Sequence, residues 1–206
     1  NADGHKYAKT AAEKGAAVII AEEPVEAPVP GILTDNTRLA LAYLSAEFFG
    51  HPAEQMHVIG ITGTKGKSST SYYLKYIFDE MMAATGGQES GVLGSIDTYD
   101  GVERFESHLT TPEPLDLQKH LFHAASCGAD YLTMEISSQA LKYGRVIGVD
   151  LACAVFLNLG EDHISPVEHP DLEDYFQSKL LIFRQAGAAC VNLDSDRAAE
   201  IWAAAA

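Results

Sequence analysis

The sequence predicts an α/β protein that contains a P-loop and a mostly parallel sheet with helices on both faces. From residue 56 onward, short apolar runs of strand length alternate with segments of helical periodicity, as in a parallel sheet covered on both sides. Two runs, residues 131–136 and 151–157, are almost continuously apolar, which is typical of strands buried on both faces. A glycine-rich turn at residues 63–66 joins a strand to a helix, the context that a phosphate-binding loop requires.

The individual elements follow from these local patterns. Apolar runs bounded by turn residues predict strands at residues 56–62, 92–98, 131–136, 151–157 and 188–192. Helical spacing predicts helices at residues 67–82, 114–127 and 172–185.

A smaller region precedes this alternating segment. Helical spacing over residues 6–14 leads into an apolar run at 16–21, which predicts a helix followed by a strand. Prolines then interrupt the pattern, so residues 22–31 are expected to form an ordered loop. Helical periodicity resumes over residues 37–49 and ends before Gly50.

The change of pattern after Gly50 predicts two domains, residues 1–53 and 54–206. We also expect the chain to be incomplete, because it begins at Asn1 without Met and ends in a run of alanines.

Composition excludes several classes of protein. A formal net charge of −15 argues against binding nucleic acid, because phosphates require clustered Lys and Arg. No stretch reaches the roughly 20 apolar residues that span a bilayer, and no leader opens the chain, so neither membrane insertion nor secretion is expected. Cys127, Cys153 and Cys190 are widely spaced within apolar segments, which favours reduced core residues of a cytoplasmic protein over a metal cluster.

The strongest chemical motif is the phosphate loop. Its glycines allow backbone N–H groups to converge on phosphate oxygens, the following helix adds its positive end, Lys67 supplies a charge and Ser68 can bind Mg²⁺. Ile61 stands where the general pattern has glycine, but a turn that merely joins strand to helix would not need Gly-Lys-Ser. The expected nucleotide-binding residues of the loop are Gly63, Thr64, Lys65, Gly66, Lys67, Ser68 and Ser69.

The loop from Thr62 to Ser68 resembles that of the Mur ligases, which also depart from the general pattern at this position. Further motifs are similar to those of the MurE branch, the tripeptide-forming UDP-N-acetylmuramoyl-dipeptide synthetases, and they occur in the same order. These motifs are Thr110-Thr111-Pro112, Met134-Glu135-Ile136-Ser137-Ser138-Gln139-Ala140-Leu141, Gly144-Arg145, Asn158-Leu159, Asp162-His163 and Tyr175-Phe176-Gln177-Ser178-Lys179.

The resemblance implies an enzyme and its substrates. It implies a cytoplasmic, monomeric, ATP-dependent ligase in peptidoglycan synthesis that adds an amino acid to UDP-N-acetylmuramoyl-L-alanyl-D-glutamate through an acyl phosphate. It also implies that residues 54–206 form an incomplete central ATP-binding domain. Residues 1–53 would then be the remainder of a smaller α/β UDP-binding domain, and the third domain, which selects the amino acid, would be absent.

The resemblance further implies roles in catalysis and metal binding. Glu135 and Ser68 would hold one Mg²⁺ and His163 a second, while Asn158 would contact the nucleotide. Lys179 would be carbamylated, which exchanges its positive charge for an oxygen ligand. By their residue types alone, Glu135 is also compatible with capping a helix, His163 with an ordinary loop and Lys179 with a solvated surface.

The muramoyl-peptide would be held by hydroxyls and a guanidinium, as the resemblance implies for Thr110, Thr111, Ser137 and Arg145. The threonines also suit a helix-entry turn, and both roles can coexist. By the same resemblance, Asn1 and Ala2 align with family residues that lie near the uridine site.

Three departures from the family pattern bear on substrate detail: Lys65 replaces Asn, Gln139 replaces His, and residues 164–166 differ from the usual run. Lys65 adds a positive charge beside the expected phosphates of the nucleotide. Two alternative functions stay open, a related ligase with another acceptor, such as a polyglutamate-forming enzyme, and a nucleotide-binding module without catalysis.

Overall fold

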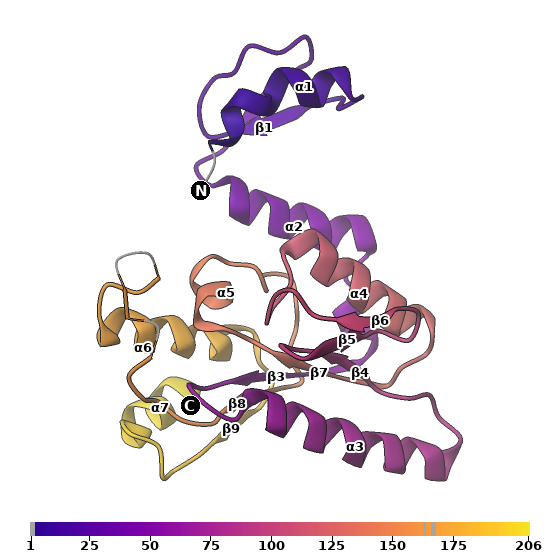
Figure 1. The fold of residues 1–206 in the computed structure, drawn as a ribbon, viewed down its shortest axis with the longest axis vertical. Coiled ribbons are helices and arrows are strands. Elements are labelled where there is room, and N and C mark those ends of the chain that lie inside the picture. Colours follow the sequence, from indigo (N-terminus) through magenta and orange to yellow (C-terminus); the bar gives the residue numbers. More distant parts are fainter. Residues whose placement is uncertain (1–2, 163, 166–167) are drawn as a thin grey trace. The chain divides into compact units, whose positions relative to one another are not determined.

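The computed structural model describes residues 3–162, 164–165 and 168–206 (Figure 1). It divides into two compact units, residues 1–41 and 42–206, and the division falls inside the helix α2 (Thr37–Phe49). In the second unit, Ala42 and Ala46 of this helix are buried. The domain boundary near residue 53 stays a prediction.

The first unit contains the short elements expected from its sequence and one more strand. A 3₁₀ turn η1 (Gly4–Tyr7) leads into α1 (Ala8–Glu13) and then into β1 (Ile19–Ala21). β1 pairs in parallel with β2 (Gly31–Leu33), a strand that begins at the end of the expected loop and was not predicted.

The second unit is built on a seven-stranded sheet of order β6-β5-β4-β7-β3-β8-β9 among the described residues. Its strands are β3 (His57–Thr62), β4 (Gly91–Leu93), β5 (Asp97–Tyr99), β6 (Arg104–Glu106), β7 (Tyr131–Glu135), β8 (Cys153–Phe156) and β9 (Ala189–Val191). The five strands β4, β7, β3, β8 and β9 are parallel, and β5 and β6 continue the sheet antiparallel. The predicted fold class is confirmed.

Helices cover both faces of this sheet (Figure 1). They are α3 (Lys67–Thr85), α4 (Pro114–Ser126), α5 (Ser138–Lys142), α6 (Leu172–Leu180) and α7 (Ala198–Ala205), with 3₁₀ turns η2 (Pro52–Gln55) and η3 (Leu181–Gln185). Figure 1 shows α3 and α4 on opposite sides of the sheet.

The alternation along β7 explains how the two faces differ. Leu132 and Met134 belong to a large apolar core together with Leu117 and Leu121 of α4. Thr133 points the other way, and its hydroxyl lies 3.1 Å from that of Ser71 on α3. Because successive strand side chains alternate between faces, β7 can bury apolar residues under α4 and small polar ones under α3.

The predicted strand at residues 92–98 is wrong, because β4 and β5 are separate antiparallel strands. The chain reverses after Gly94, whose N–H donates to the carbonyl of Asp97. A Cβ at Gly94 would lie 2.5 Å from Glu135 Oε1, so a larger residue here would displace the Glu135 carboxylate. A reversal of the chain cannot be predicted from the apolar pattern of these residues alone.

Other differences are smaller. The expected helix over residues 172–185 ends as α6 at Leu180 and tightens into the 3₁₀ turn η3. The short elements β6, α5 and α7 were not predicted. The three cysteines are free, as expected, but they are not core residues, since Cys127 and Cys153 are partly buried and Cys190 is exposed.

Within the described part of the chain, no helix has both the length and the apolar character needed to cross a membrane.

Candidate active site

The phosphate loop leaves the end of β3 and turns directly into α3. Gly63 has φ +153° and Gly66 has φ +86°, both in the region that favours glycine. A Cβ at Gly63 would also lie 2.9 Å from the Cβ of Leu157. Glycine at these positions therefore brings the loop against the residue after β8 and directs it into the first turn of α3.

Asn158, shortly after β8, makes two hydrogen bonds to the backbone of the phosphate loop. Its Oδ1 accepts the backbone N–H of Lys65 at 2.9 Å, and its Nδ2 donates to the carbonyl of the same residue at 3.0 Å. The Lys65 ammonium donates to Asp162 at 2.8 Å, with the Lys65 side chain 79% exposed. Asn158 therefore contacts the backbone of the loop, and the Lys65 ammonium pairs with the Asp162 carboxylate. The contact of Asn158 with a nucleotide stays a prediction.

Two lysines from different parts of the chain meet at the loop. Lys67 Nζ donates to the carbonyl of Gly63 at 2.9 Å, and Lys179 Nζ, from α6, donates to the same oxygen at 3.0 Å. Lys179 is 1% exposed. Its burial and the charge of Lys67 lower the pKa of Lys179 to about 7. Burial also lowers the pKa of Lys67.

An oxygen-rich group lies on the same side of the sheet as α3. The buried carboxylate of Glu135, at the end of β7, accepts from Ser68 Oγ at 3.0 Å and from the N–H of Ser95 at 2.9 Å. Ser95 Oγ lies 3.2 Å from Glu135 Oε2 and 3.0 Å from the hydroxyl oxygen of Thr110. These oxygens are of the type that Mg²⁺ prefers.

A cavity of about 150 Å³ collects most of the predicted catalytic and substrate residues. Its lining includes Lys67, Lys179, Thr110, Thr111, Ser137 and Arg145. They come from α3, α6, the segment before α4 and the region around α5, so the fold brings together residues that are far apart in sequence.

Several of these side chains already have partners. The hydroxyl of Thr111 donates to the carbonyl of Glu135 at 2.9 Å and accepts the N–H of Ser137 at 3.0 Å. Ser137 caps α5, with its hydroxyl accepting the N–H of Ala140. Arg145 forms an ion pair with Glu113 at 2.8 Å. Thr111 therefore joins the end of β7 to the start of α5 beside the cavity, and its roles in substrate binding and in helix entry stay predictions.

Three further residues contribute to the site and were not predicted from the sequence. Ser95 lies in the turn that was predicted as strand. Tyr175, within a quoted motif, places its hydroxyl 3.3 Å from Thr64 Oγ1 and its ring 4.4 Å from Lys179 Nζ. His169 places Nε2 2.9 Å from Ser138 Oγ and Nδ1 2.6 Å from Asp174 Oδ2, which links α5 to α6.

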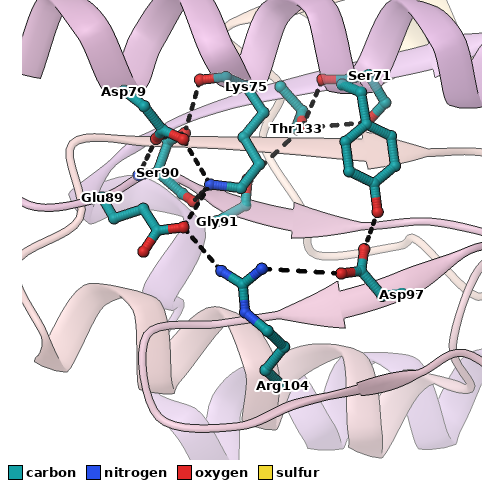
Figure 2. Close-up of polar contacts among 10 residues, drawn as sticks. Ser71, Lys75, Asp79, Glu89, Ser90, Gly91, Asp97, Arg104 and Thr133 are labelled. Atoms are coloured by element: carbon teal, nitrogen blue, oxygen red, sulfur yellow. Dashed lines mark hydrogen bonds and ion pairs between the residues drawn. The ribbon is translucent and has the colours of Figure 1, made fainter.

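A polar network fixes α3 to β4, β5 and β6 beyond the loop (Figure 2). Lys75, 4% exposed, donates to Asp79 at 2.7 Å, to Glu89 at 2.9 Å and to the carbonyl of Ser90 at 2.9 Å. Arg104 of β6 reaches Glu89 at 2.7 Å. Figure 2 shows these side chains pointing toward one another between the helix and the sheet edge.

Three predicted site residues, Asn1, Ala2 and His163, lie outside the described residues. Ser69 is exposed on the first turn of α3. Gln139, which replaces the family histidine, lines the cavity.

The comparisons with known proteins point to one family. Residues 61–206 match the family model described as the Mur ligase middle domain. The UDP-N-acetylmuramoyl-L-alanyl-D-glutamate–2,6-diaminopimelate ligase of Bacillus licheniformis is 45% identical over 187 residues, which cover 91% of this chain and 37% of that protein. The UDP-N-acetylmuramyl-tripeptide synthetase of Bifidobacterium longum is 41% identical over 186 residues, covering 89% and 35%.

A solved structure has a similar fold. The structure of a UDP-N-acetylmuramoyl-L-alanyl-D-glutamate–2,6-diaminopimelate ligase matches with a TM-score of 0.79 at 25% identity and covers 98% of this chain and 40% of that one. The chain therefore spans little more than a third of its relatives. With the family model matching most of its length, the chain belongs to the Mur ligase family.

Proposed function

We propose that the whole protein is an ATP-dependent ligase that adds the third amino acid to UDP-N-acetylmuramoyl-L-alanyl-D-glutamate in peptidoglycan precursor synthesis. The observation that carries the proposal is the cavity in which Lys67 and Lys179 face Thr110, Ser137 and Arg145. A phosphate loop and groups able to bind a carboxylate or an amide border the same space. The names and the similarity of the relatives support the choice of substrate.

The reaction joins two steps. A carboxylate oxygen of the muramoyl-dipeptide bonds to the γ-phosphorus of ATP, and ADP leaves. The amine of the incoming amino acid then bonds to the carbonyl carbon of the acyl phosphate, inorganic phosphate leaves, and the amine loses its proton. ATP and the muramoyl-dipeptide are both anions. The site must therefore position them and screen their charges with cations.

The residues of the chain suit these requirements. The backbone of the loop from Gly63 to Gly66 and the start of α3 would hold the ATP phosphates, and Lys67 would screen their charge. Arg145 would exchange its exposed partner, Glu113, for a substrate carboxylate, because a guanidinium pairs with either one. Thr110 and Ser137 would hold the peptide amides.

The donor set around Glu135 fits a magnesium ion. Glu135 and Ser68 place oxygens 3.0 Å apart beside the loop, and the backbone N–H of Ser95 donates to the Glu135 carboxylate and holds it in place. When bound there, Mg²⁺ supplies charge stabilisation at the phosphates. His163 and a carbamylated Lys179 as ligands of a second Mg²⁺ stay predictions.

The buried position and lowered pKa of Lys179 support the proposed carbamylation. A pKa of about 7 leaves a substantial fraction of the amine neutral at physiological pH, and only the neutral amine bonds to the carbon of CO₂ with release of a proton. The product would replace a buried cation by an anion beside Lys67. The dependence on ATP and the free cysteines favour a cytoplasmic enzyme. A monomeric state is a prediction from the resemblance.

Phosphate release by the full-length protein tests the proposal. ATP, Mg²⁺ and the UDP-linked dipeptide are supplied, and candidate amino acids, diaminopimelate and lysine among them, are added one at a time. We expect release that depends on one amino acid, vanishes in Lys67→Ala and persists in Lys9→Ala, a control at an exposed lysine of α1. Release with a folate and glutamate instead would overturn the proposed acceptor, and ATP binding without release would overturn the proposed catalysis.

A further inference from the structure

A second group of titratable side chains lies at the turn between β5 and β6, separate from the ATP-binding loop. Asp100, at the end of β5, is fully buried. Its Oδ2 lies 2.6 Å from Nδ1 of His120 and 2.9 Å from Nδ1 of His123. None of these side chains has a role in the proposed ligase reaction.

The backbone holds the carboxylate in place. Asp100 Oδ1 accepts the N–H of Val102 at 3.0 Å and that of Glu103 at 2.7 Å. The other oxygen is therefore directed at the imidazoles. His120 and His123 are three residues apart on α4, so they lie on one face of the helix and their Nδ1 atoms converge on the same point.

We propose that Asp100, His120 and His123 bind a divalent transition-metal ion, with Zn²⁺ as the ion that fits best. Together with Glu103, each residue offers a ligand atom, and these atoms all lie within 4.8 Å of one another. Two imidazole nitrogens and a carboxylate oxygen suit Zn²⁺, whereas Mg²⁺ and Ca²⁺ favour sites made of oxygens. The site is thus chemically distinct from the oxygen-rich group around Glu135.

Only a small movement is needed to admit the ion. Ligand atoms about 2.0–2.1 Å from a tetrahedral Zn²⁺ are about 3.3 Å apart, so the present contacts of 2.6 and 2.9 Å must open by about 0.7 and about 0.4 Å. The side chain of His123 is 19% exposed and can shift toward solvent. To bind the ion, each Nδ1 must first lose the proton that it shares with the Asp100 carboxylate, by release to solvent or by a change of tautomer, and the proton that remains on the ring is then on Nε2.

Glu103 is the fourth possible ligand. Glu103 is 40% exposed and forms an ion pair with Lys119 at 2.9 Å. Either Glu103, released from Lys119, or a water molecule completes the coordination. The bound ion would join the turn at residues 100–103 to α4, which begins shortly after Thr110 and Thr111, and would stabilise the antiparallel edge of the sheet.

Metal binding by the tag-free, chelator-treated full-length protein tests the proposal, with Co²⁺ as a spectroscopic probe and Zn²⁺ as competitor. We expect one equivalent of Co²⁺ with the intense visible absorption of a four-coordinate site, displaced by Zn²⁺ and not by excess Mg²⁺. His123→Asn should weaken binding by about 100-fold or more, whereas His108→Asn, at an exposed histidine beyond β6, should bind normally. Zinc at about 100 times its dissociation constant should lower the unfolding equilibrium constant about 100-fold, and His123→Asn should lose this protection.

Circular dichroism of the variants controls for their folding, and Glu103→Gln provides a second variant at an exposed ligand. Absence of a bound equivalent, or equal binding by His123→Asn and His108→Asn, would overturn the proposal, since the ion would then bind elsewhere. Because the readouts are absorption and unfolding, failure of the ligase assay would not affect this test.

Discussion

Lys67 and Lys179 donate to one backbone oxygen, the carbonyl of Gly63, at 2.9 and 3.0 Å, although 112 positions separate them in the numbering of the chain. Two ammonium groups that donate to the same oxygen lie close enough to repel each other, and Lys179 is also buried. Both effects favour its neutral form. If Lys179 is carbamylated as proposed, a neutral amine beside the loop is the form that would react with CO₂.

The first prediction is that activity depends on CO₂. Depleting CO₂ and bicarbonate should lower ligase activity of the full-length protein, and adding bicarbonate should restore it. Recovery should be slower as the pH falls below about 7, because the lysine pKa is about 7 and the neutral amine declines about tenfold per pH unit below it. A carbamate signal with ¹³C-bicarbonate, absent in Lys179→Arg, checks the modification. Full activity without bicarbonate and without a signal would contradict it.

The second prediction concerns stability. The pKa of Lys179 is about 7 in the folded state against an ordinary value of 10.5, so between these values the unfolded chain binds the extra proton. The free energy of unfolding should therefore rise with pH across this range. Lys179→Met should remove that rise and increase the free energy of unfolding at pH 7 by about 1–3 kcal/mol, while it abolishes activity.

Urea denaturation in CO₂-free buffer at pH 7 and pH 9 measures this effect. Lys9→Met, at an exposed lysine, should leave the free energy of unfolding unchanged. A destabilised Lys179→Met protein would show that the contact with Gly63 outweighs the cost of burying the amine.

The third prediction is that Ser95 positions Glu135 for the metal. Ser95→Ala keeps the backbone N–H bond to Glu135 at 2.9 Å but loses the hydroxyl that lies between Glu135 and Thr110. The Mg²⁺ concentration for half-maximal activity should rise about 10-fold or more, as for other residues that orient metal ligands. Ser107→Ala, which loses a hydroxyl contact to Thr98 instead, is the matched control. An unchanged Mg²⁺ requirement would exclude this role.

The fourth prediction concerns the network around Lys75. Lys75→Met leaves Asp79 and Glu89 without their buried cation and should lower the free energy of unfolding by about 2–3 kcal/mol. Arg104→Met, whose side chain is 52% exposed, should cost less than about 1 kcal/mol. Urea denaturation of both variants beside the parent protein gives the comparison.

The same network should weaken in acid. Burial alone would raise the pKa values of Asp79 and Glu89, but hydrogen bonds and the charge of Lys75 hold both below their ordinary values. Their contribution is therefore present at neutral pH and is lost as the pH falls below about 4. Lys75→Met should flatten this acid dependence, and an equally steep dependence would count against the network.

Local sequence patterns were sufficient to predict many of the helices and strands. The strands near residues 56–62 and 131–136, the loop from Gly63 to Gly66 and the helix after it were all predicted, because each depends on side chains within a few positions of one another. The family resemblance also rested on short motifs, and the family model confirms it. The roles of the individual site residues stay predictions.

Only the tertiary structure decided how distant segments meet. It broke the apolar run at residues 92–98 after Gly94, which brings Ser95 onto Glu135, and it placed Lys179 on the carbonyl of Gly63. It also brought Asp100 against His120, a contact that no pattern in the sequence indicates. Periodicity records which face of an element is buried, whereas contacts between side chains far apart in sequence depend on strand pairing and on helix packing across the sheet.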